Sequence, residues 1–274
     1  MRKILVALSL SLLTIFSANA ANELSEADKA LLALDWKTSP ATGDIGDKAK
    51  IKIPKDVLFL GNQDTQKFLK LNGNPEAPNT YTIYNPTEGW FAIFHFTAAG
   101  YVKDDEKIDA DALMKSMKER DKVDNEDRKK EGLPPLYLDG WYIPPRYDSA
   151  TKRLEWATKL HDEKNVSTIN FSTRILGRGG YMSAVLVTDP KTLDRDIKSF
   201  NTALTKFEYN PGERYSEFKE GDKIAAYGLG ALVAGGAAAA VASKGGFKLL
   251  WVAILGAFAA VGAFVKKLFG KKQG

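Results

Sequence analysis

The chain has 274 residues and a formal net charge of +5, and it contains no cysteine. This length allows one well-packed domain with accessory segments. The lack of cysteine excludes disulfides, thiolate catalysis and cysteine-ligated zinc or iron–sulfur centres.

The positive charge is concentrated at the two ends of the chain. Residues 21–222 hold all 34 acidic residues but only 30 of the 39 basic ones, so this part has a net charge near −4. The other basic residues flank apolar segments. We therefore predict no nucleic-acid binding, because no excess of basic residues remains in the central domain.

Residues 1–20 have the features of a secretory signal peptide. Arg2 and Lys3 precede the apolar stretch Ile4–Phe16, and Ala18-Asn19-Ala20 places small residues where a signal peptidase cleaves. An uncleaved signal anchor is the alternative, and the apolar stretch is short for a spanning helix. Residues 21–222 are therefore predicted to form an exported domain, located in the periplasm.

The helices and strands in the first half of this domain are predicted from capping residues, apolar periodicity and turn residues. The expected elements are, in chain order, a helix at 25–36, strands at 48–53 and 57–60, a helix at 64–71, and a hairpin of strands 81–84 and 90–97. The strand at 90–97 is apolar on both of its faces, which predicts a central, covered position in a sheet.

In the second half of the domain, the sequence predicts a long helix, four strands and a final helix. Asp109 caps a helix that ends near Gly132. The strands are expected at 136–143 and 153–160 around a turn region at 144–151, and at 166–176 and 181–188 around the turn 177–180. Asp189-Pro190 opens a helix with an apolar stripe to Leu204. Consecutive hairpins predict an α+β fold, an antiparallel sheet with helices on one face.

No catalytic, cofactor or metal motif stands out. The two histidines, His95 and His161, lie in no nucleophile–base motif; His95 is expected in the sheet or core and His161 on the surface. The acidic run 104–111 does not match a calcium-binding loop, and a solvated segment leading to a helix cap explains it. We therefore predict no cofactor and no metal.

Two features are weak candidates for a binding surface. The turn 177–180 could present Arg178 and backbone N–H groups to an anion, although a plain hairpin turn is the favoured interpretation. An aromatic and proline-rich cluster could line a groove, although such clusters more often pack a sheet face. The candidate binding residues are Tyr137, Trp141, Tyr142, Tyr147, Trp156 and Arg178.

Several short segments together resemble a bacterial family of uncharacterised membrane-anchored proteins, a domain of unknown function. They are Gly73-Asn74-Pro75, Gly100–Asp105, Gly140-Trp141, Pro145–Asp148, Leu154–Ala157, Leu176–Gly179 and Gly221–Gly228. The resemblance runs from about residue 40 to the C-terminus. It implies an exported domain with a hydrophobic tail, and it carries over no activity, ligand or catalytic residue.

Residues 223–274 are predicted to be a membrane anchor with two apolar runs, 225–242 and 249–265. Each run just reaches the length that crosses about 30 Å of hydrocarbon. The terminal lysines favour a single span, by the positive-inside tendency, with the first run as an interfacial or re-entrant helix. The short loop between the runs favours a transmembrane helical hairpin, which we predict. A hairpin buried in a soluble protein is the disfavoured alternative, because it needs a large partner surface. Small residues suited to close helix packing are Gly228, Ala231, Gly235, Gly256 and Ala260.

Three functional hypotheses follow from the sequence. The first is a noncatalytic binding or scaffold module held at the inner membrane, with the lipid bilayer and other envelope proteins as partners. The second is an envelope hydrolase that uses carboxylates such as Asp104, Asp105 or Glu155. The third is a membrane assembly factor that associates with itself through glycine and alanine in the anchor.

Overall fold

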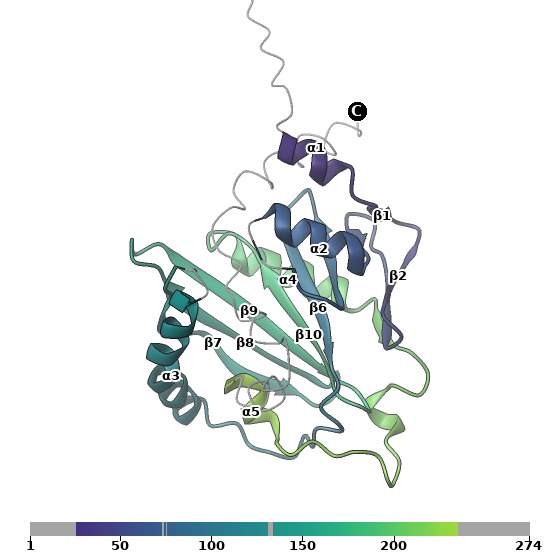
Figure 1. Ribbon diagram of the computed structural model, residues 1–274. Helices are drawn as coiled ribbons and strands as arrows, with labels where there is room; N and C mark the ends of the chain where they lie inside the picture. The colour runs from purple at the N-terminus through teal and green to yellow at the C-terminus, as the bar shows by residue number, and fades with distance from the viewer. Residues whose placement is uncertain (1–25, 73, 75, 131–133, 235–274) are drawn as a thin grey trace, which may run out of the picture.

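The computed structural model describes residues 26–72, 74, 76–130 and 134–234. An eight-stranded antiparallel sheet forms the centre, in the order β1-β4-β5-β6-β10-β9-β8-β7 (Figure 1). Its strands are β1 Lys37–Thr38, β4 Leu58–Leu60, β5 Thr80–Asn85, β6 Trp90–Thr97, β7 Tyr137–Asp148, β8 Arg153–His161, β9 Ser167–Leu176 and β10 Tyr181–Val187. A second sheet has three strands in the order β11-β3-β2, with β2 Thr42–Ile45, β3 Ala49–Lys52 and β11 Phe207–Tyr209.

Side chains alternate across the large sheet, and both of its faces are apolar. We call the side of Trp90, Phe94 and Phe171 the first face; the small sheet and helix α4 (Leu193–Leu204) cover it and build the largest core cluster. The opposite side is the second face. Near β4–β6, helices α1 (Glu26–Leu32) and α2 (Asn62–Leu71) cover the second face. Figure 1 shows α2 and α4 on opposite sides of the sheet.

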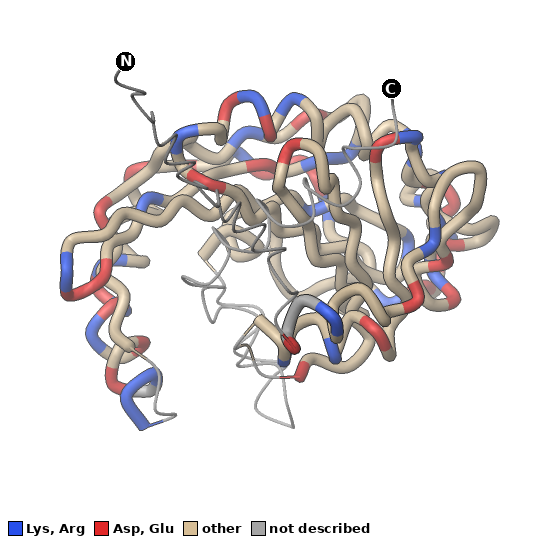
Figure 2. Tube along the Cα trace, turned by 90° about the horizontal axis from the view of Figure 1, so that it is seen from above, with Lys and Arg blue, Asp and Glu red and all other residues tan. Residues whose placement is uncertain are grey.

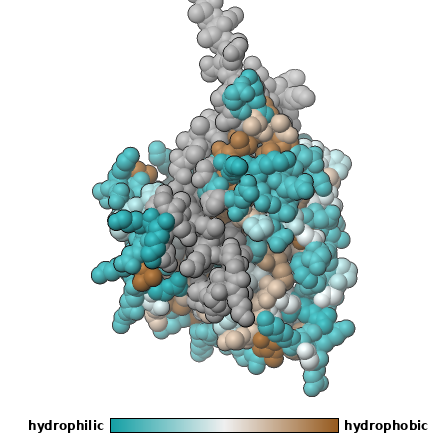
Figure 3. All heavy atoms as spheres, in the orientation of Figure 1, coloured by the Kyte–Doolittle hydropathy of each residue, from teal (hydrophilic) through white to brown (hydrophobic). Residues whose placement is uncertain are grey.

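The other half of the second face lies below helix α3 (Ala110–Lys130) and the short helix α5 (Leu229–Ala234). Helix α3 lies beside β7 and contacts α5. A short 3-10 helix, η1 (Tyr215–Glu217), precedes α5 in the chain. Figure 3 shows hydrophilic side chains over α2 and α3, while Figure 2 shows positive and negative residues interspersed along the described chain.

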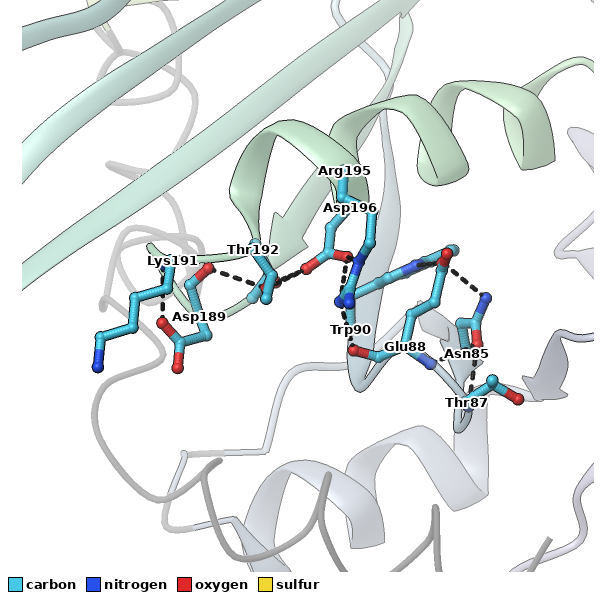
Figure 4. A network of polar contacts seen from close by, with 10 residues as sticks. Asn85, Thr87, Glu88, Trp90, Asp189, Lys191, Thr192, Arg195 and Asp196 are labelled. Carbon is cyan, nitrogen blue, oxygen red and sulfur yellow. Dashed lines mark hydrogen bonds and ion pairs between the residues drawn. The ribbon is translucent and has the colours of Figure 1, made fainter. Parts of the chain in front are cut away.

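A network of polar groups around the buried carboxylate of Asp196 fixes α4 to the hairpin β5–β6 (Figure 4). The carboxylate of Asp196 is fully buried and accepts hydrogen bonds from Thr188, Thr192 and Arg195. Arg195 also donates to the carbonyl oxygen of Glu88 at 2.8 Å, next to the Asn85 turn. A buried carboxylate is stable only when it is hydrogen-bonded or paired. The network therefore fixes the position of α4 over the first face of the sheet.

Most predicted elements are confirmed, including the α+β class, the antiparallel sheet and the central position of β6. Asp109 accepts hydrogen bonds from the N–H groups of Asp111 and Ala112, as expected of a helix cap. The expectation that helices lie on one face is wrong. Because β6 and β10 are apolar on both sides, both faces need a cover, and helices lie on each.

Two boundaries also differ from the predictions. The segment 144–151, expected as a turn region, is mostly strand, because β7 continues to Asp148 through bulges that accommodate Pro144 and Pro145. Helix α4 begins at Leu193 rather than at Pro190. The side chain of Asp189 instead accepts a hydrogen bond from the N–H of Lys191 in a preceding turn.

No helix among the described residues is long and apolar enough to cross a membrane. Residues 1–25 and 235–274 lie outside the described part, and with them the predicted signal peptide, the second apolar run and the last eight residues of the first run, 235–242. The predicted transmembrane hairpin therefore stays a prediction, as does the proposed division at residues 222 and 223. The first ten residues of the first run, 225–234, are described, and they pack on the second face.

Candidate functional site

Three loops meet at one end of the large sheet and form a structure that we call the clasp, residues 99–104, 177–180 and 213–225. The N–H of Gly100 donates to the carbonyl of Gly179 at 3.0 Å. The N–H of Tyr101 donates to the carbonyl oxygen of Lys223 at 2.7 Å, and the N–H of Ala225 donates to the carbonyl oxygen of Tyr101 at 2.9 Å. The clasp thus fixes the position from which the apolar C-terminal segment starts.

Glycine is required in the clasp because backbones approach closely there. Gly100 has φ +96°, and a Cβ at this position would lie 2.7 Å from the carbonyl oxygen of Lys223. At Gly180 a Cβ would overlap the carbonyl oxygen of Thr97. Gly100 belongs to a segment of the family resemblance, and at this position glycine allows two loops of the clasp to approach closely.

Arg178 and Asp222 form the main ion pair of the clasp. The guanidinium donates from Nε to Asp222 Oδ2 at 2.6 Å and from Nη2 to Oδ1 at 2.7 Å. This bidentate pair and the N–H of Lys219 lower the pKa of Asp222 to about 2. The candidate anion-binding residue Arg178 is therefore occupied by a carboxylate of its own chain.

Removing this pair should change the acid stability of the protein. Because the folded-state pKa of Asp222 lies below its ordinary value, the pair stabilises the fold above about pH 4 and loses its effect as the pH falls towards 2. Asp222→Asn should lower the melting temperature at neutral pH. Between about pH 4 and pH 2, the melting temperature of this variant should fall less steeply than that of the unmodified chain. Thermal unfolding followed by circular dichroism measures both effects.

The exposed neighbour Glu220 provides the matched control, since none of the described ion pairs includes it. Glu220→Gln should leave the melting temperature and its pH profile unchanged. Equal effects of the two substitutions would show that general surface charge, and not the bidentate pair, sets the acid stability.

A second polar group lies just inside the clasp and is centred on Asp104. Its carboxylate accepts hydrogen bonds from Tyr147 and Lys152 at 2.7 Å and from Tyr215 at 2.9 Å. Burial opposes its ionisation, but these hydrogen bonds outweigh burial, so the pKa of Asp104 lies below its ordinary value. Burial and the neighbouring carboxylate raise the pKa values of Tyr147 and Tyr215. Each of these groups is held in a satisfied network, which suits a structural role.

Helix α5 starts beyond the clasp and is seated on the second face. Leu229, Leu232 and Val233 are buried in a cluster with Trp156 of β8. Partly buried residues of the neighbouring segments complete this cluster: Tyr101, Ile108, Leu113, Met117, Trp141, Tyr147, Ala225 and Tyr227. The beginning of the predicted first membrane run is thus part of a hydrophobic core.

Polar side chains near and on α3 contact the backbone at both ends of α5. The carboxylate of Glu106 accepts a hydrogen bond from the N–H of Gly230 at 3.2 Å. Gly228 leaves room for this carboxylate, since a Cβ there would overlap Glu106 Oε2. Arg120 donates to the carbonyl oxygen of Ala234 at 2.8 Å. Helix ends carry unsatisfied N–H and C=O groups, and these two charges match their polarity.

A row of polar residues crosses the second face between the two helix-covered halves. His95 on β6, Ser183 on β10 and Arg174 on β9 are direct neighbours in register, and all three are buried. The guanidinium of Arg174 lies 4.9 Å from the Trp156 ring and 5.8 Å from the Tyr181 ring. Burial and the nearby Arg174 lower the pKa of His95 to about 4, so His95 is neutral at neutral pH. This confirms the expectation that His95 lies in the sheet.

The predicted aromatic cluster is divided by the fold. Trp141, Tyr147 and Trp156 belong to the cluster that holds α5, and Trp141 donates to the carbonyl of Ala110 at the start of α3. Tyr137 stacks on His161 near the other end of the same strands, and the Tyr142 hydroxyl bonds to Asp194 of α4. Three of the five aromatic residues are thus brought together, and their neighbour is a segment of the same chain.

The carboxylates proposed for a hydrolase do not converge. Glu155 is bonded to Arg146 and lies near Arg153, on the side of β8 opposite to Trp156. Asp104 lies on the Trp156 side, in the network with Tyr147 and Tyr215. Within the described residues no group of three or more histidine, aspartate or glutamate side chains could hold a metal ion.

Glu106, Arg120, Lys152 and Tyr215 were not predicted as parts of a site. Glu106 follows directly on the segment Gly100–Asp105 of the family resemblance, so this motif was the available signal. Arg120 is one of many charged residues on α3, and its partner lies 114 positions away in the chain. Such a pairing depends on tertiary structure and leaves no local pattern.

Comparison with protein families covers both the sheet domain and the apolar tail. Residues 37–269 match the family described as protein of unknown function, DUF2167. The chain belongs to this family. The matched region contains all three loops of the clasp, the Asp104 network, helix α5 and both predicted apolar runs, which confirms the family resemblance. The family itself has no assigned activity.

Comparison with curated proteins gave no match. Among solved structures, the chain is similar to the solution structure of cyanobacterial PsbP (CyanoP) from Synechocystis sp. PCC 6803, at 12% sequence identity and a TM-score of 0.36. The similarity covers 62% of this chain and 92% of the PsbP chain. At this TM-score it assigns neither a fold nor an activity to the DUF2167 protein.

Proposed function

We propose that this DUF2167 protein is a membrane-tethered module of the bacterial envelope that binds apolar helical segments on the second face of its large sheet. Its own residues 225–234 are the resident segment. The observation that carries the proposal is the seating of α5, which is buried on Trp156 and contacted at both ends by Glu106 and Arg120.

The chemistry of this seat favours binding over catalysis. Glu106 and Arg120 contact only backbone N–H and C=O groups of the segment, and its side chains meet an apolar surface. Such contacts recognise a helical apolar segment by its ends and its hydrophobic face, and they tolerate changes of side chain. A segment of another envelope protein could therefore replace the resident one.

The membrane part of the proposal rests on the sequence. A signal peptide at 1–20 and the apolar runs 225–242 and 249–265 support an inner-membrane location with residues 21–222 in the periplasm. Residues 225–234 are both the segment seated on the sheet and the first part of the apolar run 225–242. Insertion of the whole first run would therefore require α5 to leave the sheet, which couples occupancy of the seat to the membrane state of the anchor.

Thiol reactivity in the full chain tests the seat. The chain has no cysteine, so Leu232→Cys introduces a single thiol. In detergent micelles this thiol should react with a maleimide at least about tenfold more slowly than one introduced by Ala226→Cys at an exposed position, because reaction needs local opening. Adding Glu106→Ala and Arg120→Ala should raise the rate at position 232 about thirtyfold, since each of the two lost hydrogen bonds contributes about 1 kcal/mol.

Lys122→Ala, on an exposed part of α3, is the control and should leave the rate at position 232 unchanged. A labelled peptide that copies residues 225–242 should bind the Glu106 and Arg120 double variant better than the unmodified chain, because the resident segment opens more often. Equal reactivity at positions 226 and 232 would refute the seat, and absence of peptide binding by the double variant would refute exchange.

A further inference from the structure

The clasp carries an exposed apolar surface that the proposed seat does not use. Phe218 and Ile224 are 36% and 48% exposed, six residues apart in the same loop. Both contact Tyr101: the ring of Phe218 lies 4.2 Å from the Tyr101 ring, and Ile224 pairs with Tyr101 in a parallel bridge. The two side chains are therefore held by ordered backbone and ring contacts at one end of the sheet.

Three exposed lysines belong to the same loops as these two side chains and Tyr101. Lys103, Lys219 and Lys223 are exposed, and none of the described ion pairs includes them. The nearest acidic residues are partly neutralised: Asp222 is paired with Arg178, Glu217 with Arg214, and Glu213 with Lys48. Glu220 and Asp105 are exposed as well, so the surface is mixed in charge, and Lys219 and Lys223 both lie between Phe218 and Ile224 in the loop.

We propose that this end of the clasp, with Phe218 and Ile224 at its centre, lies against the headgroups of an anionic lipid bilayer. Two protruding apolar side chains with neighbouring lysines match the chemistry of a membrane interface, where apolar groups enter the headgroup region and lysines face acidic lipids. The position agrees with this, because Ile224 directly precedes the apolar run that starts at residue 225.

This inference rests on the membrane attachment in the proposed function, and it does not depend on the seating of α5. It adds an orientation: the Arg178–Asp222 end of the sheet faces the bilayer, and the opposite ends of β8 and β9, near His161 and Val166, point away from it. The ten residues of β9 separate the two ends by about 30 Å at about 3.3 Å per residue.

The experiment uses the full chain with one introduced cysteine, labelled with a polarity-sensitive fluorophore, in vesicles of phosphatidylcholine with or without phosphatidylglycerol. Labels placed by Phe218→Cys and Ile224→Cys should be quenched by lipids that carry a spin label near the headgroup. A label placed by Val166→Cys, at a 59% exposed position on the opposite end of the sheet, should not be quenched. Phosphatidylglycerol should increase the quenching at positions 218 and 224.

Charge reversal separates contact by the clasp from attachment by the tail. Lys219→Glu with Lys223→Glu should reduce the membrane-contacting population at position 224 at least about fivefold, because each lysine near an anionic surface contributes about a fivefold factor. Flotation of the whole chain with the vesicles should persist. Equal quenching at positions 224 and 166, or contact at 224 that responds neither to phosphatidylglycerol nor to charge reversal, overturns the inference. Loss of flotation in the unmodified chain would instead overturn the membrane attachment.

Discussion

Replacing Gly180 with alanine should lower the free energy of unfolding by about 3 kcal/mol, and the melting temperature by about 6–12 °C. The added Cβ would overlap the carbonyl oxygen of Thr97. Thr97 and Tyr181 are partners in the β6–β10 ladder, and Gly180 also accepts a hydrogen bond from the N–H of Gly177. Because both backbones are fixed by these bonds, neither can move aside without breaking the clasp.

Gly179 provides a control one residue away in the same turn. A Cβ at Gly179 would meet no atom within 4 Å, so Gly179→Ala should leave the melting temperature within about 2 °C of the unmodified chain. Thermal unfolding by circular dichroism compares the two variants. Equal stability of the Gly180→Ala and Gly179→Ala variants would contradict the close approach of Gly180 to the backbone of Thr97.

Replacing Trp156 with alanine should cost about 3–5 kcal/mol of the free energy of unfolding, the range found for large buried aromatic residues. Its side chain is 1% exposed and lies between the sheet and α5. The substitution leaves a cavity under α5 and removes the ring that faces the buried guanidinium of Arg174 at 4.9 Å. Chemical denaturation followed by far-ultraviolet circular dichroism, which reports on the backbone and not on the removed tryptophan, gives the change in stability.

Tyr142→Ala is the matched control, because sequence patterning placed Tyr142 and Trp156 in the same candidate binding cluster. Tyr142 is exposed and makes a single hydrogen bond of 3.3 Å to Asp194, so its removal should change the free energy of unfolding by less than about 0.5 kcal/mol. In the Leu232→Cys background, Trp156→Ala should also speed thiol labelling. A stable Trp156→Ala protein with slow labelling would mean that the ring does not support α5.

Helix α3 and strand β7 show which features of the fold local sequence patterns predict and which they do not. The cap at Asp109 and the strand at residues 153–160, next to the strand at 136–143, follow from residue type and period, and both are confirmed. The prolines at 144 and 145 indicate a turn locally, but β8 offers a continuous partner and bulges absorb the mismatch, so β7 continues through them. Tertiary pairing overrode the turn preference of these residues.

The candidate site was only partly visible in the sequence. Tyr147 and Trp156 were expected in a binding surface, and they lie in the cluster that holds α5. What they contact was not expected, because an apolar run of Ala, Gly, Leu and Val has the same composition whether it packs on a sheet or in lipid. The burial of α5 on Trp156, together with the positions of Glu106 and Arg120 at its two ends, distinguishes the seated segment.

The sequence by itself determined the class of fold, the order of the central hairpins and the family, because alternating and helical periods and short glycine motifs are local properties. Tertiary structure alone decided which faces are covered, why Arg178 faces Asp222, and that residues 225–234 lie on the second face. The physical reason is the same in each case. Burial and ion pairing join residues that are far apart in the chain, and no local pattern specifies which of them meet.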